Sequence, residues 1–160
     1  MKHLLLLCLL SWSLGVCAQQ TNPIIGIWKR NDAESTAPGT PPRMEVREYR
    51  QRPDGYLVGL AVFVSASGRP GFLQFTAKPD GTFYPEYESG TLSDLQAHGT
   101  QTPLAYSETI VDENTVEWTD QANGVTTASG TKTFSPDGRK MTFVVNIPDG
   151  ASYTLVYDRQ

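Results

Sequence analysis

The chain has 160 residues, 19% of them charged and 39% hydrophobic, and its formal net charge is −4. This length favours a single domain, and 14 glycines and 11 prolines indicate a turn-rich globular protein rather than a disordered or coiled-coil one. A mildly acidic chain without a basic block gives no electrostatic reason to expect nucleic-acid binding.

The first 18 residues have the pattern of a signal peptide. Lys2 and His3 form a short polar start, an apolar stretch runs over 4–16, and Ala18 closes a small-residue cleavage site. The apolar stretch is short for a membrane span. We therefore expect cleavage after Ala18, export to the periplasm or the extracellular space, and a domain over 19–160.

A lipid-anchored form is the alternative for this segment. Leu14-Gly15-Val16-Cys17 resembles the lipobox of bacterial lipoproteins, in which Cys17 would carry the lipid. Val16 is bulkier than the small residue expected before that cysteine, so plain cleavage is favoured.

Cleavage would remove both cysteines, Cys8 and Cys17, and leave His98 as the only histidine. A domain without cysteine has no thiol nucleophile and no thiolate metal site, and one histidine cannot build a histidine-rich metal centre. The sequence also contains no G-x-S-x-G, P-loop, G-x-G-x-x-G or H-E-x-x-H motif. We expect no metal and no cofactor, and enzymatic activity is the least favoured class of function.

The rest of the chain is divided by turn signals. Pro-Asp-Gly occurs at 53–55, 79–81, 136–138 and 148–150, and Ser67-Gly68 and Asn123-Gly124 add two more turns. We expect all four Pro-Asp-Gly segments to be hairpin turns with the glycine at positive φ. The segments between the turns are rich in β-branched and aromatic residues and are short for helices. They predict strands near 24–30, 43–51, 56–65, 71–78, 82–87, 104–111, 115–121, 125–134, 139–147 and 151–158.

Ten strands joined mostly by tight turns predict an all-β fold, a single antiparallel up-and-down meander that closes into an 8–10-stranded barrel. Alternation predicts the packed faces. These are Tyr56/Val58/Leu60/Val62/Val64, Met141/Phe143/Val145/Ile147 and Tyr153/Leu155/Tyr157. Two irregular connections stand out at 31–42 and 88–103, and 91–98 within the second has room for one or two helical turns.

A wider set of residues resembles a known family. The set begins with Gly26-Ile27-Trp28, similar to the G-x-W signature of lipocalins, and continues through nearly the whole domain. Its further members are Lys29, Asn31, Ala33, Ser35, Pro38-Gly39, Pro41-Pro42, Phe75-Thr76-Ala77-Lys78, Asp80-Gly81, Tyr84-Pro85, Asn114-Thr115-Val116-Glu117, Ser135, Asp137-Gly138 and Val156-Tyr157. The pattern resembles small exported bacterial lipocalin-like β-barrels of unknown function.

The resemblance implies a secreted or periplasmic lipocalin-like barrel and brings no catalytic residue with it. Two features depart from the pattern. True lipocalins have a helix before the last strand, where this chain has Pro148-Asp149-Gly150, and the 88–103 connection is longer than in the family.

Four residues are candidates for ligand binding: Arg47, Tyr49, Trp28 and Trp118. For Trp28 and Trp118, core packing is the favoured role and stacking on a ligand is the alternative. Strand 43–51 has two faces, Met44/Val46/Glu48/Arg50 and Glu45/Arg47/Tyr49/Gln51. The second face would place Arg47 and Tyr49 together in the barrel, where they could hold a ligand carboxylate. The alternative is that Arg43, Arg47, Arg50 and Arg52 are solvated or paired with neighbouring acids.

Three further patterns have a more ordinary interpretation. Glu86 and Glu88 share a strand face and could bind calcium or serve acid–base chemistry, but acids entering a loop are expected to be solvent-exposed. His98 is expected to be exposed and without a partner. Ser129-Gly130-Thr131-Lys132 matches S-x-x-K, the acyl-enzyme motif of penicillin-interactive enzymes, yet it lies in a predicted strand rather than at a helix start.

The sequence thus favours an exported barrel that binds a small apolar or amphipathic ligand, by analogy of fold. The alternative is a fully packed structural or protein-interaction barrel of the cell envelope with no ligand cavity. No nucleic-acid partner and no membrane span are expected, and the oligomeric state is left open.

Overall fold

The computed structural model of the chain describes residues 22–88, 104–148, 150 and 152–160. The strands of these residues follow one another along the chain with turns between them. They are β1 (Gly26–Asn31), β2 (Met44–Gln51), β3 (Leu57–Val64), β4 (Pro70–Ala77), β5 (Tyr84–Glu88), β6 (Leu104–Asp112), β7 (Thr115–Ala122), β8 (Val125–Phe134), β9 (Lys140–Asn146) and β10 (Ser152–Arg159).

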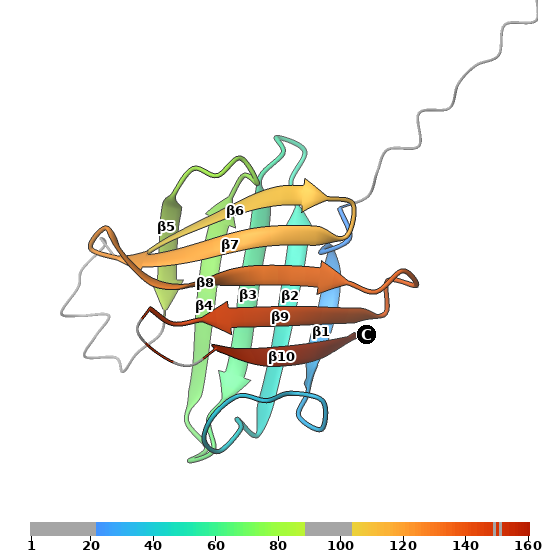
Figure 1. Ribbon diagram of the computed structural model, residues 1–160, viewed down its shortest axis with the longest axis vertical. Coiled ribbons are helices and arrows are strands. Elements are labelled where there is room, and N and C mark those ends of the chain that lie inside the picture. Colours follow the sequence, from blue (N-terminus) through green and yellow to red (C-terminus); the bar gives the residue numbers. More distant parts are fainter. Residues whose placement is uncertain (1–21, 89–103, 149, 151) are drawn as a thin grey trace, which may run out of the picture.

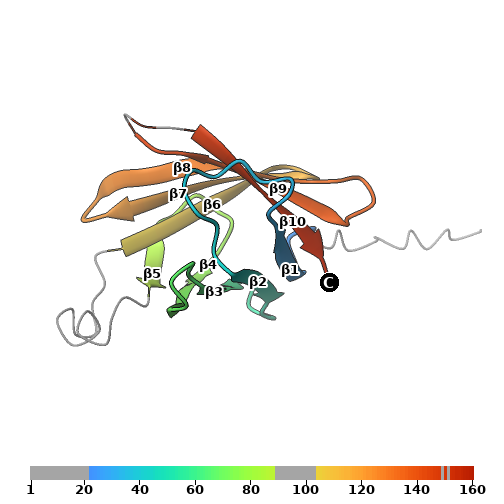
Figure 2. The same ribbon diagram turned by 90° about the horizontal axis from the view of Figure 1, so that it is seen from below.

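Each strand pairs antiparallel with the next, and β1 pairs with β10 to close the barrel. The predicted all-β antiparallel meander is therefore confirmed. β6–β10 form one wall and lie crosswise over β1–β4, which form the other (Figures 1 and 2). No helix within the described ranges is long and apolar enough to cross a membrane.

Three of the four Pro-Asp-Gly segments place their glycine in the left-handed region. The φ angles are 85° at Gly55, 77° at Gly81 and 67° at Gly138, a conformation that glycine adopts without a Cβ clash. Gly150 is different, since its φ lies outside this region although its N–H donates to the Ile147 carbonyl at 3.1 Å. The prediction that all four glycines have positive φ is thus wrong for Gly150.

Two sequence predictions concern segments outside the described residues. These are the signal peptide over 1–18, with its alternative lipidation at Cys17, and the 88–103 connection with His98 and its expected helical turns. They stay predictions.

One end of the barrel, where β1 begins and β8 and β10 end, is filled by side chains. Trp28 is fully buried and donates its indole N–H to the Ile24 carbonyl at 2.8 Å. Its ring packs on Phe134, with the ring centres 5.6 Å apart, and under the Arg159 guanidinium at 4.2 Å. Burying a large aromatic ring with its N–H bonded strongly favours the folded chain. We call this region the closed end.

Arg159 joins three segments at the closed end. Its guanidinium donates to the backbone carbonyls of Pro23, Ile25 and Gly138 at 2.5–2.7 Å. Gly26 makes room for it, because a Cβ at this position would lie 2.5 Å from Arg159 Nη1 and the φ of Gly26 is 140°. The glycine of the Gly26-Ile27-Trp28 motif therefore lets the arginine approach the tryptophan.

The face of β3 that enters the barrel is not the predicted one. Leu57 and Ala61 are buried at 1% and 5% exposure, whereas Val62 on the other face is 38% exposed. The inner face needs small residues because neighbouring strands supply large rings. A Cβ at Gly59 would lie 2.4 Å from the ring of Phe75. In contrast, β9 and β10 bury Met141, Phe143, Val145, Leu155 and Tyr157 as expected.

Candidate functional site

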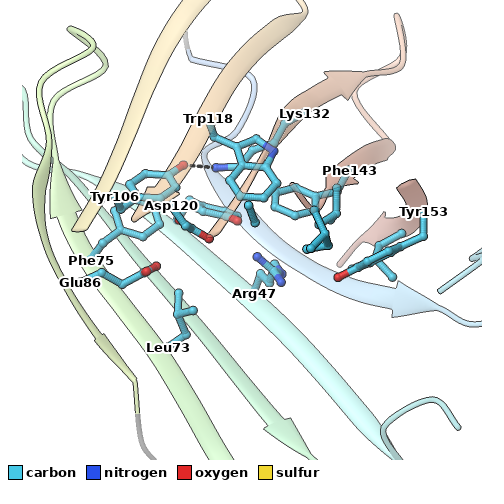
Figure 3. A pocket seen from close by; sticks show the side chains of 15 residues that line it. Arg47, Leu73, Phe75, Glu86, Tyr106, Trp118, Asp120, Lys132, Phe143 and Tyr153 are labelled. Atoms are coloured by element: carbon cyan, nitrogen blue, oxygen red, sulfur yellow. Dashed lines mark hydrogen bonds between the residues drawn. The ribbon is translucent and has the colours of Figure 1, made fainter. Parts of the chain in front are cut away.

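Beyond the closed end the barrel encloses a cavity of about 170 Å³, lined by residues of β2 and of β4–β10. Its wall is largely aromatic, and Phe75 stacks on Tyr106 with the ring centres 3.8 Å apart, as Trp118 does on Phe143 at 4.8 Å. A cavity of this size has room for one aromatic ring, since an apolar cavity of about 150 Å³ binds benzene. Figure 3 shows the arrangement.

Charged side chains enter the same space between the rings. The cavity is lined by Arg47, Glu86, Asp120 and Lys132, which come from β2, β5, β7 and β8. Figure 3 shows these four side chains approaching from different sides of the barrel. Charged groups in such a position need partners, because leaving water costs a charge several kcal/mol.

Lys132 has a set of buried partners. Its Nζ lies 3.2 Å from Glu108 Oε2, and both side chains are at most 1% exposed. Tyr106 OH donates to the same Glu108 oxygen at 2.6 Å and is hydrogen-bonded to Lys132 Nζ. Burial and the neighbouring Glu108 carboxylate raise the pKa of Tyr106 well above its ordinary value, so this phenol stays protonated.

Arg47 is also paired inside the barrel. Its Nη2 lies 2.9 Å from Glu45 Oε1, and its Nε donates to Tyr157 OH at 2.9 Å. Tyr157 OH donates to Glu45 at 2.6 Å, and Arg30 approaches the other oxygen of Glu45 at 3.3 Å. Burial opposes ionisation of Glu45, but Arg47 and Tyr157 hold its pKa below the ordinary value.

Glu86 and Asp120 differ from the other interior acids. Within the described residues neither forms an ion pair shorter than 4 Å, whereas Glu45 and Glu108 do. Asp120 Oδ1 is buried with no hydrogen-bond partner in this part of the chain, as is Glu108 Oε1, whose other oxygen is paired with Lys132. Burial, followed by the charges of Asp120 and Glu88, raises the pKa of Glu86 to about 8. Burial likewise raises the pKa of Asp120 to about 6. Near neutral pH Glu86 is therefore protonated and Asp120 is ionised.

The indole nitrogen of Trp118 is a second buried polar atom without a partner. Trp118 is 4% exposed and lines the cavity, and its Nε1 has no acceptor among the described residues. A buried donor left unpaired costs about 1–3 kcal/mol. In Trp28 the same indole N–H is hydrogen-bonded to the Ile24 carbonyl. The two tryptophans therefore differ in whether this donor has a partner.

The structure brings together three of the four residues predicted to bind a ligand. Arg47, Tyr49 and Trp118 line the cavity, whereas Trp28 lies outside the lining, in the closed end. The Glu45/Arg47/Tyr49 face of β2 is thus the inner one, and Glu45 already supplies a carboxylate to Arg47. Whether these residues bind a ligand stays a prediction.

Four interior charges were missed by sequence reasoning. Glu86 was expected to be solvent-exposed, but it is 3% exposed, and only Glu88 is on the surface. Glu108, Asp120 and Lys132 each lie two positions from a buried aromatic residue of the same strand, respectively Tyr106, Trp118 and Phe134. Because side chains two apart share a strand face, this spacing was the available signal.

The S-x-x-K match has no catalytic geometry. It lies within β8, where Ser129 and Lys132 are three apart and so point to opposite sides of the strand. Lys132 instead forms an ion pair with Glu108 and a hydrogen bond with Tyr106.

A second hollow of about 400 Å³ adjoins the cavity. It shares Arg47, Leu73, Tyr153 and Leu155 with the cavity and reaches the 32–43 segment and the β3–β4 turn through Ala37, Pro42 and Ala66. The two hollows together make the half of the barrel opposite the closed end, which we call the open half.

No family model and no curated protein matches this chain. Among solved structures, a redesigned β-barrel, mFAP1, bound to DFHBI is similar over 86% of this chain and 95% of its own, with 17% sequence identity and a TM-score of 0.38.

Proposed function

We propose that this chain is an exported β-barrel protein that binds a small amphipathic ligand in the cavity between Trp118, Phe143 and Glu86. The observation that carries the proposal is the cavity itself, with its aromatic wall and with buried polar atoms that lack partners within the described residues. Small-molecule sites typically combine an apolar wall with a few polar groups that orient the ligand.

The difference between the two ends supports binding over a purely structural role. The closed end contains Trp28, Leu57, Val116 and Met141 at 0–2% exposure, so this chain can fill a barrel with apolar side chains. The open half instead has a cavity and interior charges. Unpaired buried polar groups lower stability, which is a cost that a functional site explains.

A cavity-filling variant tests this proposal with a matched control. Ala128 lines the cavity on β8, and Thr133 lies on the outer face of the same strand. We expect native mass spectrometry of protein purified from its own host to show added mass on the parent and on Thr133→Phe, and none on Ala128→Phe. No added mass on the parent, or equal added mass on all three proteins, would contradict the proposal.

Export is part of the proposal and is tested separately. The intact mass of the secreted protein should correspond to a chain that begins at Gln19. If the mass instead corresponds to a lipid-modified chain that begins at Cys17, the protein is lipid-anchored, and the proposal of a free exported protein is wrong.

A further inference from the structure

We propose that the ligand of this cavity is a small aromatic amine bound in its protonated form, with its ammonium group held by Glu86 and Asp120. The inference rests on the proposed ligand-binding function and names the chemical class of the ligand.

The first argument is the balance of charges. Each cation that lines the cavity is already paired with an acid, since Lys132 lies 3.2 Å from Glu108 and Arg47 lies 2.9 Å from Glu45, which it shares with Arg30. Glu86 and Asp120 are the acids that remain. A bound ammonium group would balance the ionised pair, whereas an anionic ligand would add to its charge and would have to draw Arg47 away from Glu45.

The second argument is the wall around the two acids. The rings of Phe75, Tyr106, Trp118 and Phe143 face the same cavity as Glu86 and Asp120. Aromatic faces attract cations, and rings around the cavity already do so. Lys132 Nζ lies 5.0–5.7 Å from the ring centres of Tyr49, Phe75, Tyr106 and Phe143. The Arg47 guanidinium lies 4.7 Å from the ring centre of Phe143. A ring that carries an ammonium group would thus bury its apolar part and keep its charge stabilised.

The third argument is the Trp118 N–H. Two acids by themselves do not define a ligand site. Trp118 lines the same cavity and is only 4% exposed. Its Nε1 has no acceptor in the described part of the chain. The unpaired N–H lies in the wall beside Gly130 of β8, so the chain leaves a polar group of this wall without a partner among the described residues, as it does Asp120 Oδ1.

The protonation state of the pair gives the binding a direction with pH. Glu86, with a pKa of about 8, faces the charges of Asp120, Glu88, Arg47 and Lys132, and Asp120, with a pKa of about 6, faces Lys132, Arg47 and Glu88. The other titratable groups that line the cavity are the phenols Tyr49, Tyr106 and Tyr153. A bound ammonium stabilises the ionised carboxylates, so amine binding should release a proton near neutral pH and strengthen as the pH rises from about 6 to about 8.

Three probes of similar shape and different charge test the inference: phenethylamine, 2-phenylethanol and 3-phenylpropionate. In titration calorimetry near neutral pH we expect phenethylamine to bind roughly tenfold or more tightly than 2-phenylethanol, as for one charge-assisted hydrogen bond, and 3-phenylpropionate to bind most weakly. Titrations in two buffers of different ionisation enthalpy should show proton release with phenethylamine alone.

Variants locate the effect. Asp120→Asn and Glu86→Gln should each lower the affinity for phenethylamine by roughly tenfold and leave that for 2-phenylethanol unchanged, which also shows that the variants fold. Glu117→Gln, on the exposed face of β7 beside Trp118, is the matched control and should change neither affinity.

The possible failures can be told apart. If 2-phenylethanol and phenethylamine bind equally, or if 3-phenylpropionate binds most tightly, the cavity binds ligands and the amine inference is wrong. If none of the three probes binds, the amine inference and the proposed function are both wrong.

Discussion

The two halves of this barrel differ in whether their buried polar groups are hydrogen-bonded, and the two tryptophans show the difference. At the closed end Arg159 donates to three backbone carbonyls and covers Trp28, whose indole N–H is also bonded. In the open half Trp118 keeps an unbonded N–H, and Asp120 keeps an unbonded oxygen within the described residues. The closed end pairs these groups within the chain itself, whereas the open half leaves them without a partner among the described residues.

Under the proposed function, the closed end of the barrel serves stability and the open half serves ligand binding. Satisfied polar groups and close packing favour a single rigid arrangement, whereas unpaired groups lower stability unless something binds to them. Substitutions should therefore act differently at the two ends, and the following predictions use that difference, from the largest expected effect to the smallest.

The open half contains buried ion pairs, and breaking the pair formed by Lys132 and Glu108 should have the largest effect. Lys132→Met leaves Glu108 buried without its cation, and we expect the free energy of unfolding to fall by about 3–5 kcal/mol. Replacing both partners, as Lys132→Met with Glu108→Leu, should recover much of this loss. Urea unfolding measures both variants, and a double variant as unstable as the single one would show that the pair is not an isolated unit.

The acid pair should make stability depend on pH. Glu86 binds its proton more tightly in the folded protein than in the unfolded chain, since its pKa rises from 4.5 to about 8. The free energy of unfolding should therefore fall as the pH rises from about 4.5 to about 8, by an amount on the order of 3 kcal/mol.

Glu86→Gln removes the titrating group, so most of this fall should disappear and the variant should be more stable than the parent at the upper end of that pH range. Glu117→Gln, which changes an exposed acid of β7, is the control. Melting temperatures across the range decide it, and parallel pH curves for the parent and Glu86→Gln would contradict the assignment.

The two tryptophans allow the most direct comparison of the halves. Trp28→Phe loses a 2.8 Å hydrogen bond and leaves the Ile24 carbonyl unpaired, whereas Trp118→Phe loses an N–H that has no acceptor in the described chain. We expect the first substitution to cost about 1–3 kcal/mol more than the second in chemical denaturation. Equal costs would mean that the Trp118 N–H is bonded after all.

The turns should show the smallest effects. Gly55 and Gly138, at the closed end, have positive φ and nothing within 4 Å of an added Cβ, so Gly55→Ala and Gly138→Ala should each cost about 1 kcal/mol through the backbone alone. Gly150→Ala, in the β9–β10 turn, should cost less because its φ lies outside the left-handed region. Thermal melts of the three variants compare them directly.

The sequence was sufficient for the fold because turn chemistry and alternation agree along most of the chain. Three Pro-Asp-Gly turns adopt the expected glycine conformation, and the inner faces of β9 and β10 follow their apolar residues. β3 reversed its expected face because the inner position had to be Gly59, beneath the Phe75 ring. Alternation shows where two faces differ, but not which face must leave room for a neighbour.

The site was only half predictable for a related reason. Arg47 and Tyr49 were predicted to share an inward face of strand 43–51, and they line the cavity with Trp118, for which core packing was the favoured role. Glu86 and Lys132 were assigned to solvent or to chance, since single charges in strands are usually exposed. Their burial depends on pairing across strands far apart in sequence, such as Lys132 with Glu108, which no local pattern reports.

The central claim, that one half of the barrel binds a small molecule and the other only supports the fold, can be tested on the two indole N–H groups. Their NMR signals can be assigned with Trp28→Phe and Trp118→Phe and followed during titration with phenethylamine. The account predicts that the Trp118 signal moves to saturation while the Trp28 signal stays in place. Two unmoved signals, or a shift at Trp28 as large as at Trp118, would contradict it.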